Sequence, residues 1–304
     1  MASIAATEPA ITFGPRRPSR ARAFVRICRG KPIGVVAGAI CVLLVLVALG
    51  ANELAPHAPE ATRFPRMHAP SRAYPLGTDN LFRDIYSRIL IGSRISLGIG
   101  FGAVAMGTVM GTLLGLVAGY YRGWADMIVS RALEVVLGFP PLVLALFILS
   151  IFKTDKGFSL PSFIWMSFAI GLIITPTTAR IVRGSVLSIR ALQYIEAAES
   201  MGATPSRIIL RHVLPNVMAP IIVIASIQIG NAILAEAALS FIGVGISDDS
   251  HPSWGKMLQD TRAQWQAAWW LSVMPGAAIS IAVLSFNLFG DALRDILDPR
   301  LRSS

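Results

Sequence analysis

Side chains that could bind nucleotides are sparse in this 304-residue sequence. A phosphate-binding loop needs a glycine, four residues and then Gly-Lys-Ser or Gly-Lys-Thr, so that backbone amides can cradle phosphates. Of the four lysines, only Lys31 and Lys256 follow a glycine, and both sites lack the first glycine and the final hydroxyl residue. The sequence therefore contains no nucleotide-binding loop of this kind.

Other catalytic patterns are also missing. None of the four histidines stands in a His-Glu-x-x-His pattern or a similar metal-binding spacing. There is no Gly-x-Ser-x-Gly nucleophile elbow either. We therefore expect no metal site, no cofactor and no enzymatic activity in this chain.

One polar stretch is informative in another way. Residues 194–216 lie between two long apolar segments and keep helix-forming composition over about twenty residues, which is uncommon for a loop. Residues 191–201 are predicted to form a short helix that ends at Gly202, because glycine adopts a left-handed conformation at little cost. A helix in such a loop indicates contact with something outside the apolar part of the molecule.

A second short helix is expected directly after the first. Thr204 is a suitable N-cap for a helix over 205–213, and Pro215 would then mark the start of the next apolar segment. Ala197 and Ala198 would present a low, flat surface to a partner protein. The alternative is a surface helical hairpin that has no partner.

The composition favours a membrane protein. Hydrophobic residues make up 54% of the chain and charged residues 14%, whereas soluble domains carry about 25% charged residues. The net charge of +10 could suggest nucleic-acid binding, but seven of the 27 basic residues lie in the first 31 positions, before an apolar run. That distribution is typical of the cytoplasmic flank of a membrane helix, so we expect no nucleic-acid partner.

The N-terminal region is predicted to have two parts. Residues 1–31 are rich in Ala, Pro, Ser and Arg and are predicted to be a disordered, basic, cytoplasmic N-terminus. The apolar run 32–51 is longer than the core of a signal peptide, so we interpret it as an uncleaved first membrane span. Cys28 and Cys41 are expected to be unpaired apolar filler.

Five further segments are long enough to cross a hydrocarbon layer of about 30 Å. They lie near 94–119, 126–151, 161–181, 213–237 and 269–290. With the first span this makes an all-α membrane protein with six transmembrane helices, in which residues 94–304 form the core domain and 191–213 form a helical loop between spans four and five. An even number of spans places both termini on the cytoplasmic side.

The loop charges agree with this orientation except in one segment. Residues 52–93 would be extracytoplasmic although they carry several arginines, which are usually retained on the cytoplasmic side. Those arginines are Arg63, Arg66, Arg72, Arg83 and Arg88. The acids of the same segment nearly balance them, namely Glu53, Glu60, Asp79 and Asp84.

Span two contains a glycine at every fourth position. These residues are Gly107, Gly111, Gly115 and Gly119. A four-residue spacing places them on nearly one face of a helix, which lets a second helix approach closely in lipid. We therefore assign them to helix packing.

Span three carries two further signals. Pro140 and Pro141 should kink or break it. Arg131 and Glu134 lie three residues apart on one helical face, which predicts an ion pair rather than a proton relay. Near the outer end of span six, an aromatic belt is expected from the residues Trp254, Trp265, Trp269 and Trp270.

The polar loop also resembles a known element. Glu196-Ala197-Ala198, then Gly202, then Leu214-Pro215 is similar to the "EAA" loop of ABC importer membrane subunits. Three further blocks resemble the dipeptide, oligopeptide and nickel permeases, in particular their C-type subunit. The blocks are 75–79 with 83–84 and 87–88, 238–245 with 252–255 and 257–258, and 287–291 with 293–295 and 297–300. One departure is Glu134, where the family has Asp, and the carboxylate is kept.

The resemblance implies a type I ABC importer fold and a transport function. The chain would be the permease subunit of an ATP-driven importer in the bacterial inner membrane, with ATP hydrolysis on a separate subunit. Its expected partners are a homologous second permease, two ATP-binding cassette ATPases, an extracytoplasmic substrate-binding protein and membrane lipid. The resemblance assigns ATPase docking to Glu196, Ala197, Ala198, Gly202, Leu214 and Pro215. Peptides, nickel chelates and glutathione-like molecules are all substrates compatible with it.

Two other classes of protein fit the sequence less well. A secondary transporter or channel would need polar groups near mid-membrane and often has two symmetric halves. The clear charges of the spans lie towards their ends, and no internal repeat is visible. A membrane-bound enzyme would need a catalytic constellation, and the sequence contains none that we recognise.

Overall fold

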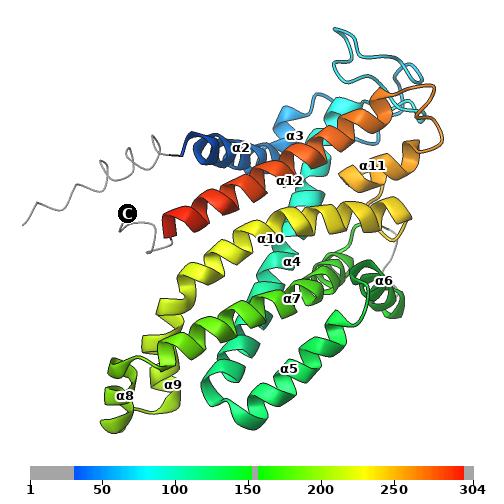
Figure 1. Ribbon diagram of the computed structural model, residues 1–304. Coiled ribbons are helices and arrows are strands. Elements are labelled where there is room, and N and C mark those ends of the chain that lie inside the picture. The colour runs from blue at the N-terminus through cyan, green and yellow to red at the C-terminus, as the bar shows by residue number, and fades with distance from the viewer. Residues whose placement is uncertain (1–30, 153–156, 298–304) are drawn as a thin grey trace, which may run out of the picture.

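The computed structural model describes residues 31–152 and 157–297. The expectations for residues 1–30, for Cys28 and for the closing residues 298–300 therefore lie outside the described residues. Among the described residues the structure is helical, with a single isolated β-bridge between Thr78 and Asp84 and no strand. Figure 1 shows an elongated bundle with short helices at its lower end and long loops at its upper end.

Twelve helical elements follow one another along the described chain. They are α2 (Pro32–Leu49), α3 (Ala51–Leu54), α4 (Ile85–Tyr121), α5 (Gly123–Leu137), α6 (Pro141–Ile151), α7 (Leu160–Arg190), α8 (Gln193–Ser200), α9 (Pro205–Ile208), the π-helix η1 (Ile209–Val213), α10 (Leu214–Ile242), α11 (Trp254–Thr261) and α12 (Trp270–Leu297). Five helical stretches are long and apolar enough to cross a membrane, or six if the bent pair α5 and α6 forms one span.

The third span is broken rather than continuous. The helices α5 and α6 meet at an angle of 94° across residues 138–140. Pro140 precedes the first residue of α6, Pro141, where a proline is tolerated because its missing N–H has no helical partner. The prediction of a kink or break at these prolines is confirmed.

The helices α4 and α7 form the most extensive helix pair of the bundle. The glycines 107, 111, 115 and 119 of α4 all face α7. A Cβ atom at Gly111 would lie 2.6 Å from Cβ of Thr178 and 2.8 Å from the carbonyl oxygen of Thr175. Ordinary contacts between carbon atoms are about 3.5–4.0 Å. The backbones of α4 and α7 can therefore lie this close together only because α4 has no side chain at these positions.

The apolar core continues from this pair toward the upper end. Ile99 and Ala103 of α4 pack with Met166 and Ile170 of α7, and α6 closes this cluster with Leu149. A separate cluster joins α2, α10 and α12. Cys41 is buried in that second cluster, as a small apolar residue would be.

Several helix boundaries differ from those predicted, and two of them change the architecture. Span two begins at Ile85 rather than near residue 94, because the Asp84 carboxylate caps the helix by accepting from the N–H groups of Tyr86 and Ser87. The second short helix does not end before span five. It continues through η1 into α10, so that Pro205–Ile242 forms one long helical stretch. Pro215 lies in the first turn of α10.

The tryptophans do not form a single belt. Trp265 and Trp269 are exposed, whereas Trp254 and Trp270 are buried. The indole N–H of Trp254 donates to the carbonyl of Ile89, and that of Trp270 donates to the carbonyl of Thr78. These two hydrogen bonds therefore join α11 to α4 and α12 to the segment before α4. The spacing of the tryptophans in the sequence does not predict this role.

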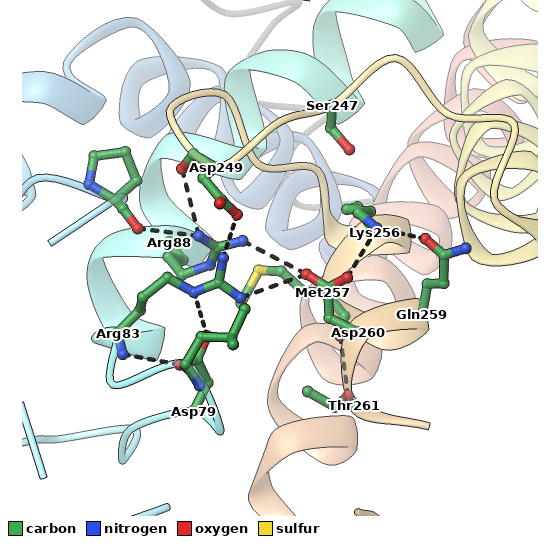
Figure 2. Close-up of polar contacts among 12 residues, drawn as sticks. Asp79, Arg83, Arg88, Ser247, Asp249, Lys256, Met257, Gln259, Asp260 and Thr261 are labelled. Carbon is green, nitrogen blue, oxygen red and sulfur yellow. Dashed lines mark hydrogen bonds and ion pairs between the residues drawn. The ribbon is translucent and has the colours of Figure 1, made fainter. Parts of the chain in front are cut away.

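The segment before α4 is folded onto α11 and the loop 243–253. Arg83 and Arg88 are almost fully buried there and contact Asp79, Asp249 and Asp260 (Figure 2). Two of the arginines that conflicted with an extracytoplasmic position are therefore paired inside the protein.

Candidate functional site

The polar stretch of the sequence forms a helical hairpin at the lower end of the molecule (Figure 1). We call residues 191–213 the α8–η1 loop. Gly202 has φ of +80° and follows α8 as predicted. Its N–H donates to the carbonyl of Glu199 at 2.9 Å, and the N–H of Ala203 donates to the carbonyl of Ala198 at 3.1 Å. This pair of bonds is a Schellman motif, which needs the left-handed conformation that glycine supplies.

The start of the second short helix follows the prediction only in part. Thr204 stands at the N-cap position and Pro205 is the first helical residue. The hydroxyl of Thr204 makes no capping bond and instead lies 3.4 Å from the hydroxyl of Ser206. The turn is therefore set by Gly202 and Pro205 more than by a side-chain cap.

One face of the α8–η1 loop is packed against the bundle. Ile195 and Ala198 of α8 and Ile208 of α9 are buried in a cluster with Val182 and Val186 of α7. This apolar contact holds the hairpin in one orientation against the ends of the long helices. A helix of eight residues needs such tertiary contacts, since isolated helices of that length are unstable in water.

The docking residues assigned from the sequence separate into two groups. Glu196, Ala197, Gly202 and Pro215 are exposed. Ala198 is 6% exposed and Leu214 is half-buried, and both pack against the apolar cluster beneath the loop. The expectation that Ala197 and Ala198 form one flat outer surface is therefore wrong for Ala198, because α8 turns it inward.

Polar contacts tie α8 to the ends of two membrane helices. Arg190, at the end of α7, donates to the backbone carbonyl of Tyr120 at the end of α4. Its guanidinium lies 4.9 Å from the centroid of the Tyr120 ring. Glu199 of α8 accepts from the Tyr120 hydroxyl at 3.4 Å and lies 4.0 Å from Arg190. The helix α8 is therefore in direct polar contact with the ends of α4 and α7.

The exposed face of the loop has the composition of a protein-docking surface. Met201 is 81% exposed and Leu210 is 63% exposed, and the charged residues Glu196, Arg207 and Arg211 of the same loop are exposed too. Apolar side chains with a polar rim are typical of interfaces between proteins. Within the described residues, no three His, Cys, Asp or Glu side chains are grouped so that they could hold a metal ion.

Some of these residues were not predicted. Tyr120 and Arg190 lie at the ends of long helices, and their sequence context resembles that of any interfacial aromatic or basic residue. Met201 precedes Gly202 directly, so its exposure follows from the position of the glycine turn.

The ion pair between Arg131 and Glu134 is present at 2.8 Å and both side chains are exposed.

The four packing glycines lie elsewhere, along the contact between α4 and α7. Gly119 is nearest to the α8–η1 loop, and a Cβ atom there would lie 2.7 Å from Cβ of Val186. Val186 belongs to the same apolar cluster as Ile195 and Ala198. The glycine contact and the base of the loop are therefore continuous.

Comparison with known sequences decides the family. The sequence model described as "Binding-protein-dependent transport system inner membrane component" matches residues 111–303, which is well over half of the chain. The chain belongs to this family. The matched range includes the α8–η1 loop and α10 to α12, so the permease is covered where the candidate site lies.

Curated relatives agree with this assignment. The permease is 41% identical over 284 residues to the glutathione transport system permease protein GsiD of Pectobacterium atrosepticum, a match that covers 93% of this chain and 92% of the relative. It is 42% identical over 238 residues to the dipeptide transport system permease protein DppC of Alkalihalophilus pseudofirmus, covering 78% and 76%. It is also 38% identical over 281 residues to GsiD of Escherichia coli O6:K15:H31, covering 92% and 90%.

Solved structures show the same fold. The permease matches a chain of the MetNI methionine ABC transporter in inward facing conformations with a TM-score of 0.57 and 18% identity, covering 70% of this chain and 98% of that chain. A second crystal form gives a TM-score of 0.55 at 20% identity, covering 69% and 96%. The fold is that of a type I ABC importer permease, and the chain is a membrane permease subunit of such an importer in the bacterial inner membrane.

Proposed function

We propose that this permease imports a peptide or a peptide-like molecule such as glutathione, and that the α8–η1 loop is its docking site for a separate ATPase subunit. The names of the relatives support the substrate class, since they are glutathione and dipeptide permeases. The observation that carries the docking assignment is the two-sided loop, with an apolar face fixed to the bundle and an exposed face that the described chain leaves uncovered.

The exposed residues take the direct part in docking. Glu196, Ala197 and Gly202 lie on the outer face of the hairpin, and Pro215 is exposed where the loop joins α10. Ala198 and Leu214 support the same site from inside, because they set how the hairpin rests on α7 and α10. The low side chain of Ala197 and the absent one of Gly202 let a partner backbone approach closely.

The contacts of the loop suggest how movement is transmitted. Two ATPase subunits that close on ATP would draw this loop toward the loop of a homologous second permease. Through Arg190, Tyr120 and Glu199 the displacement reaches α4 and α7. The helices then move as rigid bodies between inward-facing and outward-facing arrangements, which is a two-state switch of the kind found in many transporters.

The orientation and the remaining partners follow from this assignment. The α8–η1 loop and the N-terminus would be cytoplasmic, and residues 52–84 with the loop 243–253 would face the extracytoplasmic side. A substrate-binding protein would deliver its ligand there. The helix α4 has 37 residues and a length of about 55 Å, so it reaches beyond a hydrocarbon layer of about 30 Å.

The docking assignment is tested by two substitutions at Gly202. The space around Gly202 is open, with nothing within 4 Å of an added Cβ atom, so any effect comes from its φ of +80°. Gly202→Val should disrupt the turn because β-branched residues tolerate positive φ poorly, whereas Gly202→Asn should be tolerated because asparagine adopts this conformation more readily. The measurement is co-purification of the ATPase with the permease, followed by ATP-driven uptake of labelled dipeptide or glutathione in proteoliposomes.

We expect Gly202→Val to lose most ATPase binding and uptake while remaining folded in the membrane, and Gly202→Asn to retain both. Normal assembly and transport by Gly202→Val would show that the docking assignment is wrong. Uptake that needs neither ATP nor an ATPase subunit would instead contradict the proposed function as a whole.

A further inference from the structure

A compact group of six charged side chains (Figure 2) lies around α11 and the start of α4, at the end of the molecule opposite the α8–η1 loop (Figure 1). It contains three cations and three anions, which balance. The cations are Arg83, Arg88 and Lys256, and the anions are Asp79, Asp249 and Asp260. They come from the segment before α4, from the start of α4, from the loop 243–253 and from α11.

Arg83 is the central member of the group and is held from two sides. Its Nε lies 2.6 Å from Asp79 Oδ2, and its backbone N–H donates to Asp79 Oδ1 at 2.8 Å. Its Nη2 lies 3.5 Å from Asp260. The side chain of Arg83 is 2% exposed, those of Asp79 and Asp260 are 6% and 17% exposed, and these three residues form a buried unit.

Asp249 differs from the other two acids. Its carboxylate contacts Nη1 of Arg83, yet its side chain is 70% exposed. It lies in a loop without regular structure, and Arg88 holds that loop through the backbone carbonyl of Asp249 at 3.4 Å rather than through the carboxylate. The carboxylate can therefore leave Arg83 by a side-chain rotation while the backbone of the loop stays anchored.

The charge balance depends on Asp249. Without its carboxylate, the three cations Arg83, Arg88 and Lys256 would face only Asp79 and Asp260, an excess of one positive charge, and Nη1 of Arg83 would lose its contact with Asp249. A buried donor without an acceptor and an uncompensated positive charge are both costly, so the vacated position on Nη1 of Arg83 favours another anion. Because Arg83 is already fixed by Asp79, this position is preorganised for a carboxylate.

The neighbouring segment exposes two further arginines close in sequence to the exposed acid Glu60. Arg63 and Arg66 are exposed on the segment that pairs with this region. The N–H of Phe64 donates to the carbonyl of Phe82, and the N–H of Met67 donates to the carbonyl of Asp79, so these backbone bonds hold both arginines beside the turn that leads to Arg83. Exposed arginines attract and orient an acidic side chain of a partner.

We propose that Asp249 occupies a carboxylate site on Arg83 in the resting permease, and that an acidic side chain of the extracytoplasmic substrate-binding protein displaces it on docking. This inference rests on the proposed function, because it assumes that such a protein docks at this end. Asp249 is thus an internal competitor, and the affinity of the permease for its partner is reduced by the fraction of time for which Asp249 occupies Arg83.

The test compares variants of the assembled transporter in nanodiscs. The dissociation constant for the binding protein of the same transporter, purified separately, is measured at low and at high ionic strength. Asp249→Asn removes the competing charge with little change of shape and should tighten binding by at least about threefold at low ionic strength. Asp249→Glu keeps a competing carboxylate and should bind as the unmodified transporter does. Glu60→Gln removes the same charge from an exposed acid of the same segment and should tighten binding by less than Asp249→Asn.

Each result has a defined meaning. The proposal is supported if Asp249→Asn binds the binding protein more tightly than the unmodified transporter does, if this gain in affinity disappears at high ionic strength, and if Asp249→Glu binds with unchanged affinity. Unchanged or weaker binding by Asp249→Asn, or an equal gain in Glu60→Gln, overturns it while the proposed function stands. A transporter that neither associates with any binding protein nor shows ATP-driven uptake overturns both.

Discussion

The contact between α4 and α7 predicts a measurable cost for the smallest possible side chain at Gly111. In Gly111→Ala the new methyl group would lie 2.6 Å from Cβ of Thr178 and 2.8 Å from the backbone oxygen of Thr175. To restore ordinary contacts the helices must separate locally by about 1 Å. Overpacking of this kind typically costs about 1–3 kcal/mol.

A matched control isolates this cost. Gly184 lies in the interior of α7 and has nothing within 4 Å of an added Cβ atom. Replacing a helical glycine by alanine stabilises a helix by roughly 0.5–1 kcal/mol through the unfolded state, and both substitutions carry that gain. The difference between Gly111→Ala and Gly184→Ala is therefore the packing cost alone, about 1–3 kcal/mol.

The assay is thermal denaturation of the purified permease in detergent, with the apparent Tm of each variant measured at one scan rate because unfolding of membrane proteins is often irreversible. We expect Gly184→Ala to equal or exceed the unmodified protein, and Gly111→Ala to denature at least about 2 °C below Gly184→Ala. Equal apparent Tm values for the two variants would refute the argument that glycine is needed for this close approach.

Two further predictions concern the ends of the molecule. Ala198→Leu should lower the apparent Tm, because Ala198 is 6% exposed in the cluster beneath α8. Ala197→Leu should leave the apparent Tm unchanged and reduce co-purification of the ATPase, because Ala197 is exposed. A loss of Tm in Ala197→Leu alone would contradict the observed orientation of α8. Burial acts to raise the pKa of the Asp248 carboxyl, but hydrogen bonds from the N–H groups of Phe158 and His251 and from the His251 ring outweigh it, so the pKa lies below its ordinary value. The stabilisation from Asp248 is then complete above the ordinary aspartate pKa of about 4 and is lost as the pH falls through the lower folded value. Hydrogen exchange at the Phe158 amide, corrected for its intrinsic rate, should lose protection over that pH range in the unmodified protein but not in Asp248→Asn, and a loss that is equal in both would contradict the role of Asp248.

Local sequence signals were sufficient for several elements. Gly202 predicts its own turn, because few other residues adopt positive φ cheaply, and the turn has φ of +80°. The prolines at 140 and 141 predict the break between α5 and α6 for a similarly local reason. Runs of about twenty apolar residues predict membrane spans because the thickness of the hydrocarbon layer sets the length that they need.

Other features depend on which helices pack together, and the chain alone does not show that. Ala197 and Ala198 are the same residue type at adjacent positions, yet only Ala198 is buried, because α8 packs against α7 through the face that carries Ala198. The continuous helical path from α9 through η1 into α10 also depends on packing, since Pro215 suggests a break, whereas it lies in the first turn of α10 and does not interrupt that path.

The sequence by itself determined the number of apolar segments, the helical loop and the glycine stripe, because each follows from residue type and spacing along one helix. Only the tertiary structure decided that Arg83 and Arg88, which conflict with the expected orientation when they are counted as exposed charges, are buried among Asp79, Asp249 and Asp260. Asp249 is more than 160 residues beyond Arg83 in the chain. The energy of a buried charge depends on partners brought together by folding, and no local pattern encodes that pairing.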